Sequence, residues 1–308
     1  MKDTLRIATR ESRLALWQAE HVAGLLCKAH PGLTVELVPM TTKGDQILDT
    51  TLAKIGGKGL FIKELETAML EGRADIAVHS MKDVPAELPE GFRIAAVLER
   101  EDPRDALVSP TWSRLDDVPA GSVIGTSSLR RQAQVRYARP DLAIEPVRGN
   151  VETRLRKLDE GNFAAILLAA AGLKRLGLAH RIAGFLPDTL SLPAVGQGAV
   201  GVECLVDDGK TAEILAAVEH PVTRRCVDAE RAFAEGLQAS CESPIAGYAV
   251  EENGQVHLRG LAAARDGSGV LKGEITGPAG EATELGARLA RQLMDQGAAR
   301  LLAVGADE

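Results

Sequence analysis

Aromatic residues and long apolar runs are scarce in this sequence, and each scarcity excludes a class of protein. Aromatic side chains make up 3% of the 308 residues, so a stacking platform for single-stranded nucleic acid is not expected. The net charge of −7 argues against a general attraction to phosphate backbones. No apolar run approaches the roughly 20 residues of a membrane span, and residues 1–6 lack the apolar core of a secretory signal. We therefore expect a cytoplasmic monomer that binds neither nucleic acid nor membranes.

The four cysteines, Cys27, Cys204, Cys226 and Cys241, lie far apart and form no C-x-x-C pair. Their spacing supports neither a zinc site nor a disulfide framework, and the six histidines show no metal-binding spacing, so no metal is expected. Three of the cysteines fall in helix-like or strand-like runs, where a buried and inert thiol is expected. Cys241 differs, because the residues around it (Gln-Ala-Ser-Cys-Glu-Ser-Pro, 238–244) are small and polar, as in a loop.

Strand and helix patterns alternate over the first two-thirds of the chain, which is typical of α/β sheets with parallel strands covered by helices. The alternation restarts after Pro103, which predicts two similar α/β domains around a cleft. The predicted first domain comprises residues 1–99 and 199–217, and the second comprises residues 104–193.

A different pattern begins near residue 221 and predicts a third, smaller α+β domain over residues 221–308. A helix at 222–237 precedes the Cys241 loop, and another is predicted at about 282–297. Three strands lie between them, around Tyr248, His257 and Leu271, and predict a three-stranded antiparallel sheet. The first two strands meet at Asn253-Gly254, a favoured hairpin turn.

Hydroxyl and cationic side chains follow several predicted strands, at the sheet edge where α/β folds bind ligands. A helix N-terminus favours anions, and the forked guanidinium of arginine suits a carboxylate or phosphate. Each such residue alone is more simply a helix cap or a solvated surface group. Several on one edge of an acidic protein favour an anion-binding cleft. The segments are Thr9-Arg10-Glu11-Ser12, His79-Ser80-Met81-Lys82-Asp83, Gly125-Thr126-Ser127-Ser128-Leu129-Arg130-Arg131 and Arg148-Gly149-Asn150.

Two further features have both a functional and a simple structural interpretation. Residues 54–59 are rich in glycine but lack the G-x-x-x-x-G-K-[ST] spacing of a phosphate loop. They form either a flexible loop that offers Lys54 and Lys58 to a polyanion or a plain strand-to-helix connection. Asp83 either stabilises cationic intermediates and moves protons, or pairs with Lys82 and caps the next turn.

Taken together, these segments resemble the porphobilinogen deaminase (hydroxymethylbilane synthase) family in order and spacing over essentially the whole chain. The resemblance is carried by Arg6-Ile7-Ala8-Thr9-Arg10-Glu11-Ser12, residues 54–61, His79-Ser80-Met81-Lys82-Asp83-Val84-Pro85, residues 125–131, Val147-Arg148-Gly149-Asn150, Gln197-Gly198 and Cys241-Glu242-Ser243-Pro244-Ile245-Ala246. The chain departs from the family pattern at Ser240 and Glu242, where members often have a glycine and a less acidic residue.

The resemblance implies a transferase of tetrapyrrole (porphyrin and haem) biosynthesis. Such enzymes join four porphobilinogen molecules head to tail, release four ammonia molecules and free linear hydroxymethylbilane. The chain grows on a dipyrromethane cofactor, which is assembled from porphobilinogen and held through a thioether to a loop cysteine. Cys241 matches that cysteine, and Asp83 matches the catalytic carboxylate.

The remaining site residues are also assigned by the resemblance, as groups that hold the carboxylates of the pyrrole rings. Arg154 and Arg175 rest on it alone. Besides Cys241 and Asp83, the implied cofactor-binding residues are Ser80, Lys82, Thr126, Ser128, Arg130, Arg131, Arg148 and Gly149. The implied substrate-binding residues are Arg10, Ser12, Arg148, Arg154, Arg175 and Gln197, and a mobile loop carries Lys54 and Lys58.

Other classes of function share some of these features. Type II periplasmic solute-binding proteins also have two α/β domains around an anion-lined cleft, and the first two domains of the family resemble that fold. The third domain and Cys241 argue against this interpretation, and fold likeness alone would not separate the two. A polyanion-regulated interaction protein is a more distant alternative.

Overall fold

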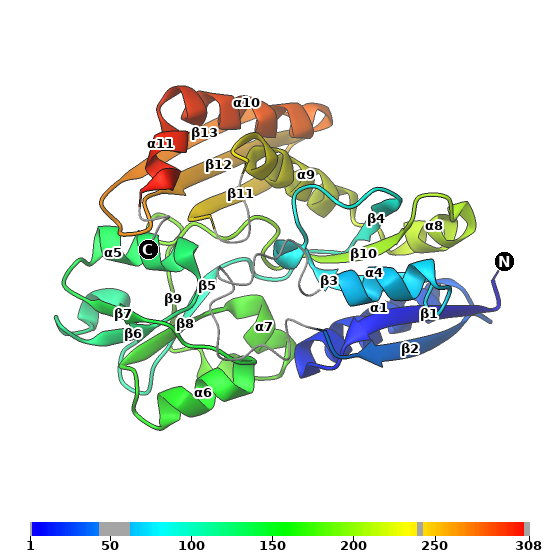
Figure 1. Ribbon diagram of the computed structural model, residues 1–308, viewed down its shortest axis with the longest axis horizontal. Helices are drawn as coiled ribbons and strands as arrows, with labels where there is room; N and C mark the ends of the chain where they lie inside the picture. The colour runs from blue at the N-terminus through cyan, green and yellow to red at the C-terminus, as the bar shows by residue number, and fades with distance from the viewer. Residues whose placement is uncertain (1, 43–61, 239–242, 305–308) are drawn as a thin grey trace. The chain divides into compact units, whose positions relative to one another are not determined.

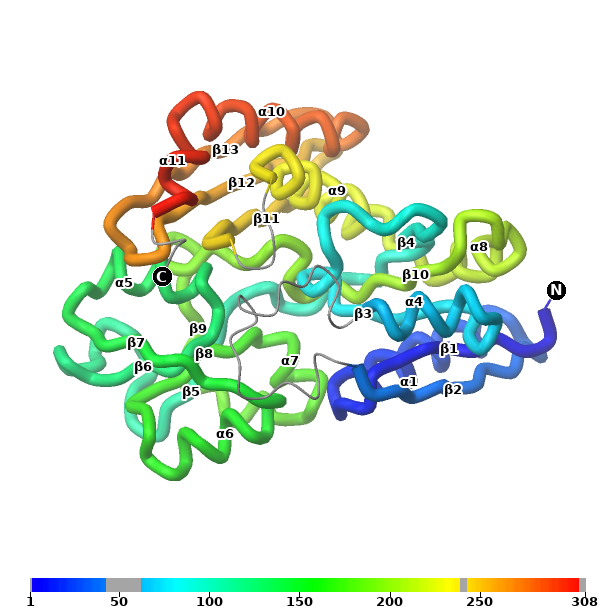
Figure 2. The backbone as a smooth tube through the Cα atoms, viewed as in Figure 1, coloured from blue at the N-terminus to red at the C-terminus, as the bar shows by residue number. Residues whose placement is uncertain are grey.

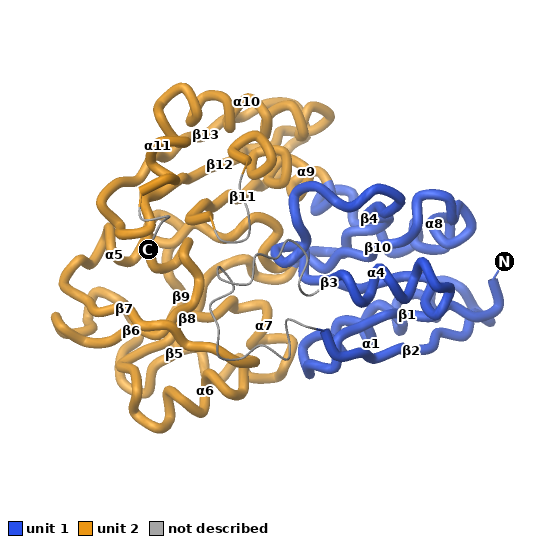
Figure 3. Tube along the Cα trace, in the orientation of Figure 1, with its two compact units in different colours: residues 1–100, 199–224 blue, residues 101–198, 225–308 orange. Residues whose placement is uncertain are grey.

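The protein forms two compact units, residues 1–100 with 199–224 and residues 101–198 with 225–308 (Figure 3). A computed structural model describes residues 2–42, 62–238 and 243–304. Within these described ranges, no helix is both long enough and apolar enough to cross a membrane.

Unit 1 is built on a five-stranded sheet, sheet A, with the order β2-β1-β3-β10-β4 (Figure 1). β1 is parallel to β2 and β3, whereas β10 is antiparallel to both β3 and β4. The expectation of a wholly parallel sheet is therefore wrong, because β10 enters the sheet from the opposite end after a long excursion of the chain (Figure 2). The strands are β1 (Thr4–Arg10), β2 (Thr34–Met40), β3 (Ile76–Ser80), β4 (Phe92–Val97) and β10 (Val200–Leu205).

Helices cover both faces of sheet A. α1 (Arg13–Ala29) and α8 (Gly209–Leu215) pack on one face, where Val22, Leu26 and Ile214 meet the strand residues Ile7 and Val202. α4 (Lys63–Leu70) covers the other face through a second apolar cluster. The short 3-10 helices are η1 (Met81–Asp83) and η4 (Ala216–Val218).

Unit 2 contains a second mixed sheet, sheet B, with the order β7-β6-β8-β5-β9. β6 is parallel to β7 and β8, whereas β5 is antiparallel to β8 and β9. α6 and α7 pack on one face, and α5 contributes to the core on the other. The elements are β5 (Asp105–Val108), η2 (Leu115–Asp117), β6 (Val123–Gly125), α5 (Leu129–Ala138), β7 (Ala143–Glu145), α6 (Val151–Asp159), β8 (Ala165–Ala169), α7 (Ala170–Arg175), η3 (Ala179–Arg181) and β9 (Gly184–Phe185).

The predicted three-stranded antiparallel sheet is confirmed and lies in unit 2 as sheet C, β11-β12-β13. α9 and α10 cover it through a core centred on the fully buried Phe233. Gly260 on the middle strand makes room for that ring, because a Cβ there would lie 2.5 Å from Phe233 Cζ. The elements are α9 (Pro221–Gly236, which begins in unit 1), β11 (Ile245–Glu252), β12 (Gln255–Ala263), β13 (Val270–Pro278), η5 (Ala279–Glu281), α10 (Ala282–Asp295) and α11 (Ala298–Ala303).

The burial expected for the cysteines is confirmed for Cys204 and Cys226 but is wrong for Cys27. Cys27 is exposed because it lies on the outer side of α1, while its neighbour Leu26 points into the core. Cys241 lies outside the described residues.

Candidate active site

The predicted site residues of unit 1 meet at one edge of sheet A. β1 and β3 run in parallel, so Arg10, the last residue of β1, and Ser80, the last residue of β3, lie at the same edge. Ser12 is the N-cap of α1, where its hydroxyl accepts the backbone N–H of Ala15 at 3.4 Å. Lys82 and Asp83 follow in η1. The residues predicted to follow β1 and β3 therefore lie together at one edge of sheet A.

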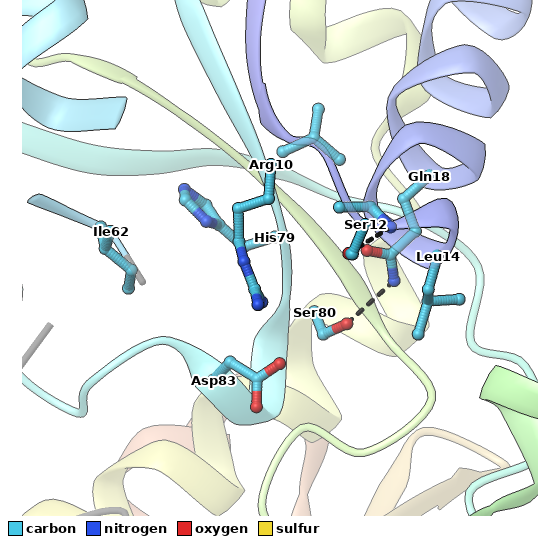
Figure 4. Close-up of a pocket in the computed structure, with 10 residues that line it drawn as sticks. Arg10, Ser12, Leu14, Gln18, Ile62, His79, Ser80 and Asp83 are labelled. Carbon is cyan, nitrogen blue, oxygen red and sulfur yellow. Dashed lines mark hydrogen bonds between the residues drawn. The ribbon is translucent and has the colours of Figure 1, made fainter. Parts of the chain in front are cut away.

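A small pocket opens at this edge and is drawn in Figure 4. The Arg10 guanidinium extends toward the side of the pocket where the Asp83 carboxylate lies, and the Ser12 and Ser80 hydroxyls face the same space. Among the described residues that line this pocket, Asp83 is the only carboxylate. The lining residues are Arg10, Ser12, Leu14, Ala15, Gln18, Ile62, Val78, His79, Ser80 and Asp83.

The turn that carries Asp83 is anchored by the residue two positions earlier, Met81. Its backbone N–H donates to the carbonyl oxygen of Ala199 at 3.0 Å, and its side chain is 1% exposed. Gly201 on β10 leaves room for that side chain, since a Cβ there would lie 2.1 Å from the Met81 sulfur. Because Met81 is held in the core, the exposed Asp83 in the same 3-10 turn is held at the pocket.

A buried polar pair stands behind the pocket, on the α4 side of sheet A. His79 Nε2 lies 2.8 Å from Glu203 Oε2, and both side chains are buried. The other Glu203 oxygen has no hydrogen-bond partner in the part of the chain that the structure describes. Burial, followed by the charge of Glu203, raises the pKa of the nearby Glu66. This cluster was not predicted from the sequence, because a lone histidine in a strand is more often a core residue than a functional one.

The predicted residues of unit 2 gather at one edge of sheet B for the same topological reason. β6 and β7 are parallel, so Thr126 and Ser128 after β6 lie at the same edge as Arg148 and Gly149 after β7. The antiparallel β5 begins at this edge, where Asp105 pairs with Ala169 at the end of β8. Ser128 is the N-cap of α5 and accepts the backbone N–H of Arg131.

The side chains of Arg130 and Arg131 point inward from α5 and form ion pairs with Asp105, which is fully buried. Arg130 donates from Nη1 and Nη2 at 2.8 and 3.0 Å, and Arg131 donates from Nε and Nη2 at 2.9 and 2.7 Å. Ser191 Oγ and Gln197 Nε2 add bonds at 2.7 and 2.9 Å. Burial alone would raise the pKa of Asp105, but the two arginines hold it well below its usual range.

One buried donor of this network, on Arg130, makes no hydrogen bond to the described residues. Arg130 Nε has no hydrogen-bond partner within the described ranges, although the arginine is only 4% exposed. Both arginines were predicted from the sequence as site residues, but Asp105, their common acceptor, was not. A carboxylate placed directly before the apolar run Ala-Leu-Val was the available signal, because a charge at the start of a buried strand needs partners.

Gly149 adopts a backbone conformation that favours glycine, with φ of +107°. A Cβ at this position would lie 2.7 Å from both Cβ and Cγ2 of Thr153. The Gly149 carbonyl accepts Arg154 Nε at 2.8 Å, which ties Arg154 to the same turn. Arg148, Gly149 and Arg154 are therefore brought together, although Arg154 was assigned by resemblance alone.

Arg175 and Gln197 are both held by internal hydrogen bonds in unit 2. Arg175 Nη2 donates to the carbonyl oxygen of Gly198 at 2.6 Å, and burial lowers the pKa of this arginine. Gln197 is 1% exposed and donates to the carbonyl oxygen of Pro103 at 2.6 Å. Lys54, Lys58 and Cys241, together with its neighbours Ser240 and Glu242, lie outside the described residues. In the described part of the chain, no group of three or more His, Cys, Asp or Glu side chains is placed to hold a metal ion.

Comparison with known protein families gives two matches. Residues 5–213 match the model of "Porphobilinogen deaminase, dipyromethane cofactor binding domain". Residues 224–295 match the model of "Porphobilinogen deaminase, C-terminal domain". The two matches together cover most of the chain.

Three of the solved structures with some likeness to the chain are named as binding proteins, and their sequence identity to it is low. A putative methionine-binding lipoprotein of Bacillus subtilis is 13% identical, with a TM-score of 0.44, over 71% of this chain and 90% of that one. The periplasmic aliphatic sulphonate binding protein of Escherichia coli is 14% identical, with a TM-score of 0.42, over 77% and 71%. A nutrient binding protein of Burkholderia cenocepacia bound to methionine is 12% identical, with a TM-score of 0.43, over 73% and 95%. Likeness at this level carries no conclusion about function.

Proposed function

The chain belongs to the porphobilinogen deaminase family, and from this membership we propose which of its residues carry the reaction. The reaction itself is that of the family: a transferase polymerises porphobilinogen into hydroxymethylbilane in tetrapyrrole biosynthesis. In each addition the C–N bond of the aminomethyl group breaks, and ammonia leaves with the bonding electron pair. The resulting methylene carbon bonds to a ring carbon of the growing chain, which then loses its proton. Water ends the sequence by releasing the product.

Asp83 is our proposed catalytic residue. Loss of ammonia leaves positive charge on the pyrrole, and a carboxylate beside it stabilises that charge most directly. The observation that carries the proposal is that Asp83 is the one carboxylate among the described residues that line the pocket, which also holds the cationic Arg10. Asp83 Oδ is also a suitable acceptor for the proton that the ring carbon loses.

We propose that Arg10, Ser12, Ser80 and Lys82 bind the acetate and propionate groups of the pyrrole rings. Ser80 and Lys82, which the resemblance assigns to the cofactor, are proposed to hold the ring in the pocket both when it belongs to the cofactor and when it belongs to incoming porphobilinogen. The chemistry of the set supports this, since two cations and two hydroxyls offer only positive charge or O–H and N–H donors to an anion. Arg10, Ser12 and Ser80 also line the pocket with Asp83. An acidic chain that gathers such donors at one sheet edge has a specific anion to hold.

The residues of unit 2 fit the dipyrromethane cofactor of the family. The Nε of the buried Arg130, which has no hydrogen-bond partner among the described residues, would give a bound polycarboxylate an unused donor. Gly149 keeps the turn beside Arg148 in a positive-φ conformation that packs closely against Thr153. Thr126, Ser128, Arg130, Arg131, Arg148 and Gly149 would hold its carboxylates, with Cys241 as its thioether anchor. When bound, the cofactor supplies a covalently held pyrrole end to which substrate units are added.

Arg154, Arg175 and Gln197 are proposed substrate-binding residues, and Lys54 and Lys58 are proposed to act from a mobile loop. Hydrogen bonds to the backbone carbonyl oxygens of Gly149 and Gly198 support the assignment of Arg154 and Arg175, because each bond fixes the orientation of a guanidinium group. Gln197 contacts Asp105 and so joins the arginine network. We also retain the three-domain division at residues 1–99 with 199–217, 104–193 and 221–308. A cytoplasmic, monomeric state is likewise proposed, to be tested by fractionation and sedimentation.

The test of the catalytic assignment is Asp83→Asn. This variant should keep the covalent adduct but lose turnover by at least about 100-fold, because the neutral amide no longer offsets the positive charge. Glu87→Gln is the matched control, since Glu87 is an exposed carboxylate four residues away that does not line the pocket. It should turn over like the wild type. Turnover by Asp83→Asn within about twofold of that control would remove Asp83 from the mechanism.

A further inference from the structure

Both serine hydroxyls of the pocket already accept a hydrogen bond from α1. Ser12 Oγ accepts the Ala15 backbone N–H at 3.4 Å, and Ser80 Oγ accepts Gln18 Nε2 at 2.9 Å (Figure 4). A hydroxyl that receives an N–H on its oxygen turns its own hydrogen elsewhere. The two serines therefore present hydrogen-bond donors, and this matters because the pocket's own carboxylate, Asp83, repels an anionic ligand.

The position of Gln18 in the fold favours this hydrogen bond to Ser80. Gln18 is 3% exposed and lies on the buried face of α1, next to Ala19. Ser80 reaches it because side chains alternate along β3. His79 points to the α4 side with Glu203, so Ser80 points to the α1 side. A polar amide buried on a helix face needs a partner, and within the described ranges the Gln18 nitrogen donates to Ser80 Oγ.

We propose that Gln18 is a positioning residue that fixes the Ser80 hydroxyl as a donor to a carboxylate of the pyrrole bound in the pocket. This inference rests on the proposed function, in which Ser80 contacts the ligand. Without Gln18 the hydroxyl would rotate freely, and ligand binding would have to order it at a cost in conformational entropy. With Gln18, the donor is oriented before the ligand arrives.

Gln18→Glu reverses the hydrogen bond with little change of shape. The ionised carboxylate has no hydrogen to donate, so it would accept the Ser80 O–H and turn it away from the ligand. In the holoenzyme, KM for porphobilinogen should rise about 10-fold, as expected for one lost hydrogen bond to a charged group, with a smaller change in kcat. Gln18→Met removes the amide but leaves the hydroxyl free to rotate, so its KM should rise less, about threefold. Gln292→Glu, on the exposed side of α10, adds the same charge at a remote site and should leave KM unchanged.

A double-mutant cycle with Ser80→Ala separates positioning from packing. If Gln18 acts through the Ser80 hydroxyl, Gln18→Glu should add little to KM once that hydroxyl is gone. An equal KM effect of Gln18→Glu in both backgrounds, with Ser80→Ala itself impaired, would overturn the role of Gln18 and leave Ser80 in the site. A Ser80→Ala enzyme with wild-type KM would overturn the assignment of Ser80 as well. A larger KM for Gln18→Met than for Gln18→Glu would also refute the proposal.

Discussion

Arg131 donates two hydrogen bonds to a single oxygen of Asp105, from Nε at 2.9 Å and from Nη2 at 2.7 Å. The relationship follows from topology. β5 is antiparallel to its neighbours, so its first residue lies at the edge where the parallel strands of sheet B end. A cation that follows β6 in the sequence thereby meets an acceptor at the first position of β5. The pair is buried, and its loss would leave an uncompensated charge in the core.

Asp105→Asn should therefore destabilise the protein by about 3–5 kcal/mol at neutral pH. The pKa of Asp105 is depressed in the folded state, so its contribution is present above the ordinary aspartate value of 3.8 and is lost as the pH falls below it. Urea unfolding at several pH values should show the gap to the wild type narrowing in acid. Asp116→Asn, which removes an exposed ion pair with Arg114, should change stability by no more than about 0.5 kcal/mol. Equal losses for the two variants would contradict the structural role of Asp105.

Gly149→Ala should lower both stability and substrate affinity. The added Cβ is strained at φ of +107° and collides with Thr153, at a combined cost of about 1–3 kcal/mol. The turn must shift to relieve the collision, which moves Arg148 and Arg154. Gly161→Ala is the matched control, because its φ of +82° carries the strain but a Cβ there meets nothing within 4 Å. The Tm of Gly149→Ala should be lower than that of Gly161→Ala and its KM should be higher, and a KM equal to that of the control would count against a binding role for this turn.

Glu66→Gln should stabilise the protein at pH 8 but not at pH 4. The pKa of Glu66 is raised in the folded state by burial and by Glu203, so its ionisation costs stability as the pH rises above the ordinary glutamate value of 4.5. An amide removes that cost. We expect a Tm higher by about 2–4 °C at pH 8, equivalent to about 1 kcal/mol. Glu71→Gln, just after the same helix and exposed, should not reproduce the effect. A Glu66→Gln protein that is less stable than the wild type at pH 8 would show that the carboxylate is a needed partner.

Thiol alkylation of the native protein should modify Cys27 before the buried cysteines. Cys27 is exposed, whereas Cys204 and Cys226 are buried, and burial raises the pKa of Cys204. Iodoacetamide followed by peptide mass mapping should find label at Cys27 in the folded protein, with Cys204 and Cys226 labelled only after denaturation. Rapid native labelling of Cys204 would contradict its place in the core of sheet A.

Much of the local structure could be predicted from the sequence, because period and turn chemistry are local properties. The helix predicted at 222–237 is α9 at Pro221–Gly236, and the helix predicted at about 282–297 is α10 at Ala282–Asp295. The hairpin at Asn253-Gly254 is also confirmed, since both residues have the positive φ that its turn requires, 51° and 73°.

Strand direction and buried polar pairs could not be predicted, because they depend on residues far apart in the chain. An apolar run indicates that β10 is a strand but not that it enters sheet A antiparallel to β3. His79 and Glu203 are 124 residues apart, and neither shows its partner locally. For Cys27, helical periodicity indicated a helix, but its exposure depended on which face of α1 meets the sheet. The polar residues that follow the predicted strands did include Arg130 and Arg131, but they gave no indication that Asp105 is the acceptor that holds both side chains.

The central claim is that this chain builds its product on a pyrrole chain anchored at Cys241, and intact mass under denaturing conditions tests it most directly. The active wild-type protein should exceed its polypeptide mass by a covalent adduct of two pyrrole units, and Cys241→Ser should lack both the adduct and the activity. The Cys27→Ser control should retain both. A bare polypeptide mass from fully active wild-type protein would contradict the account.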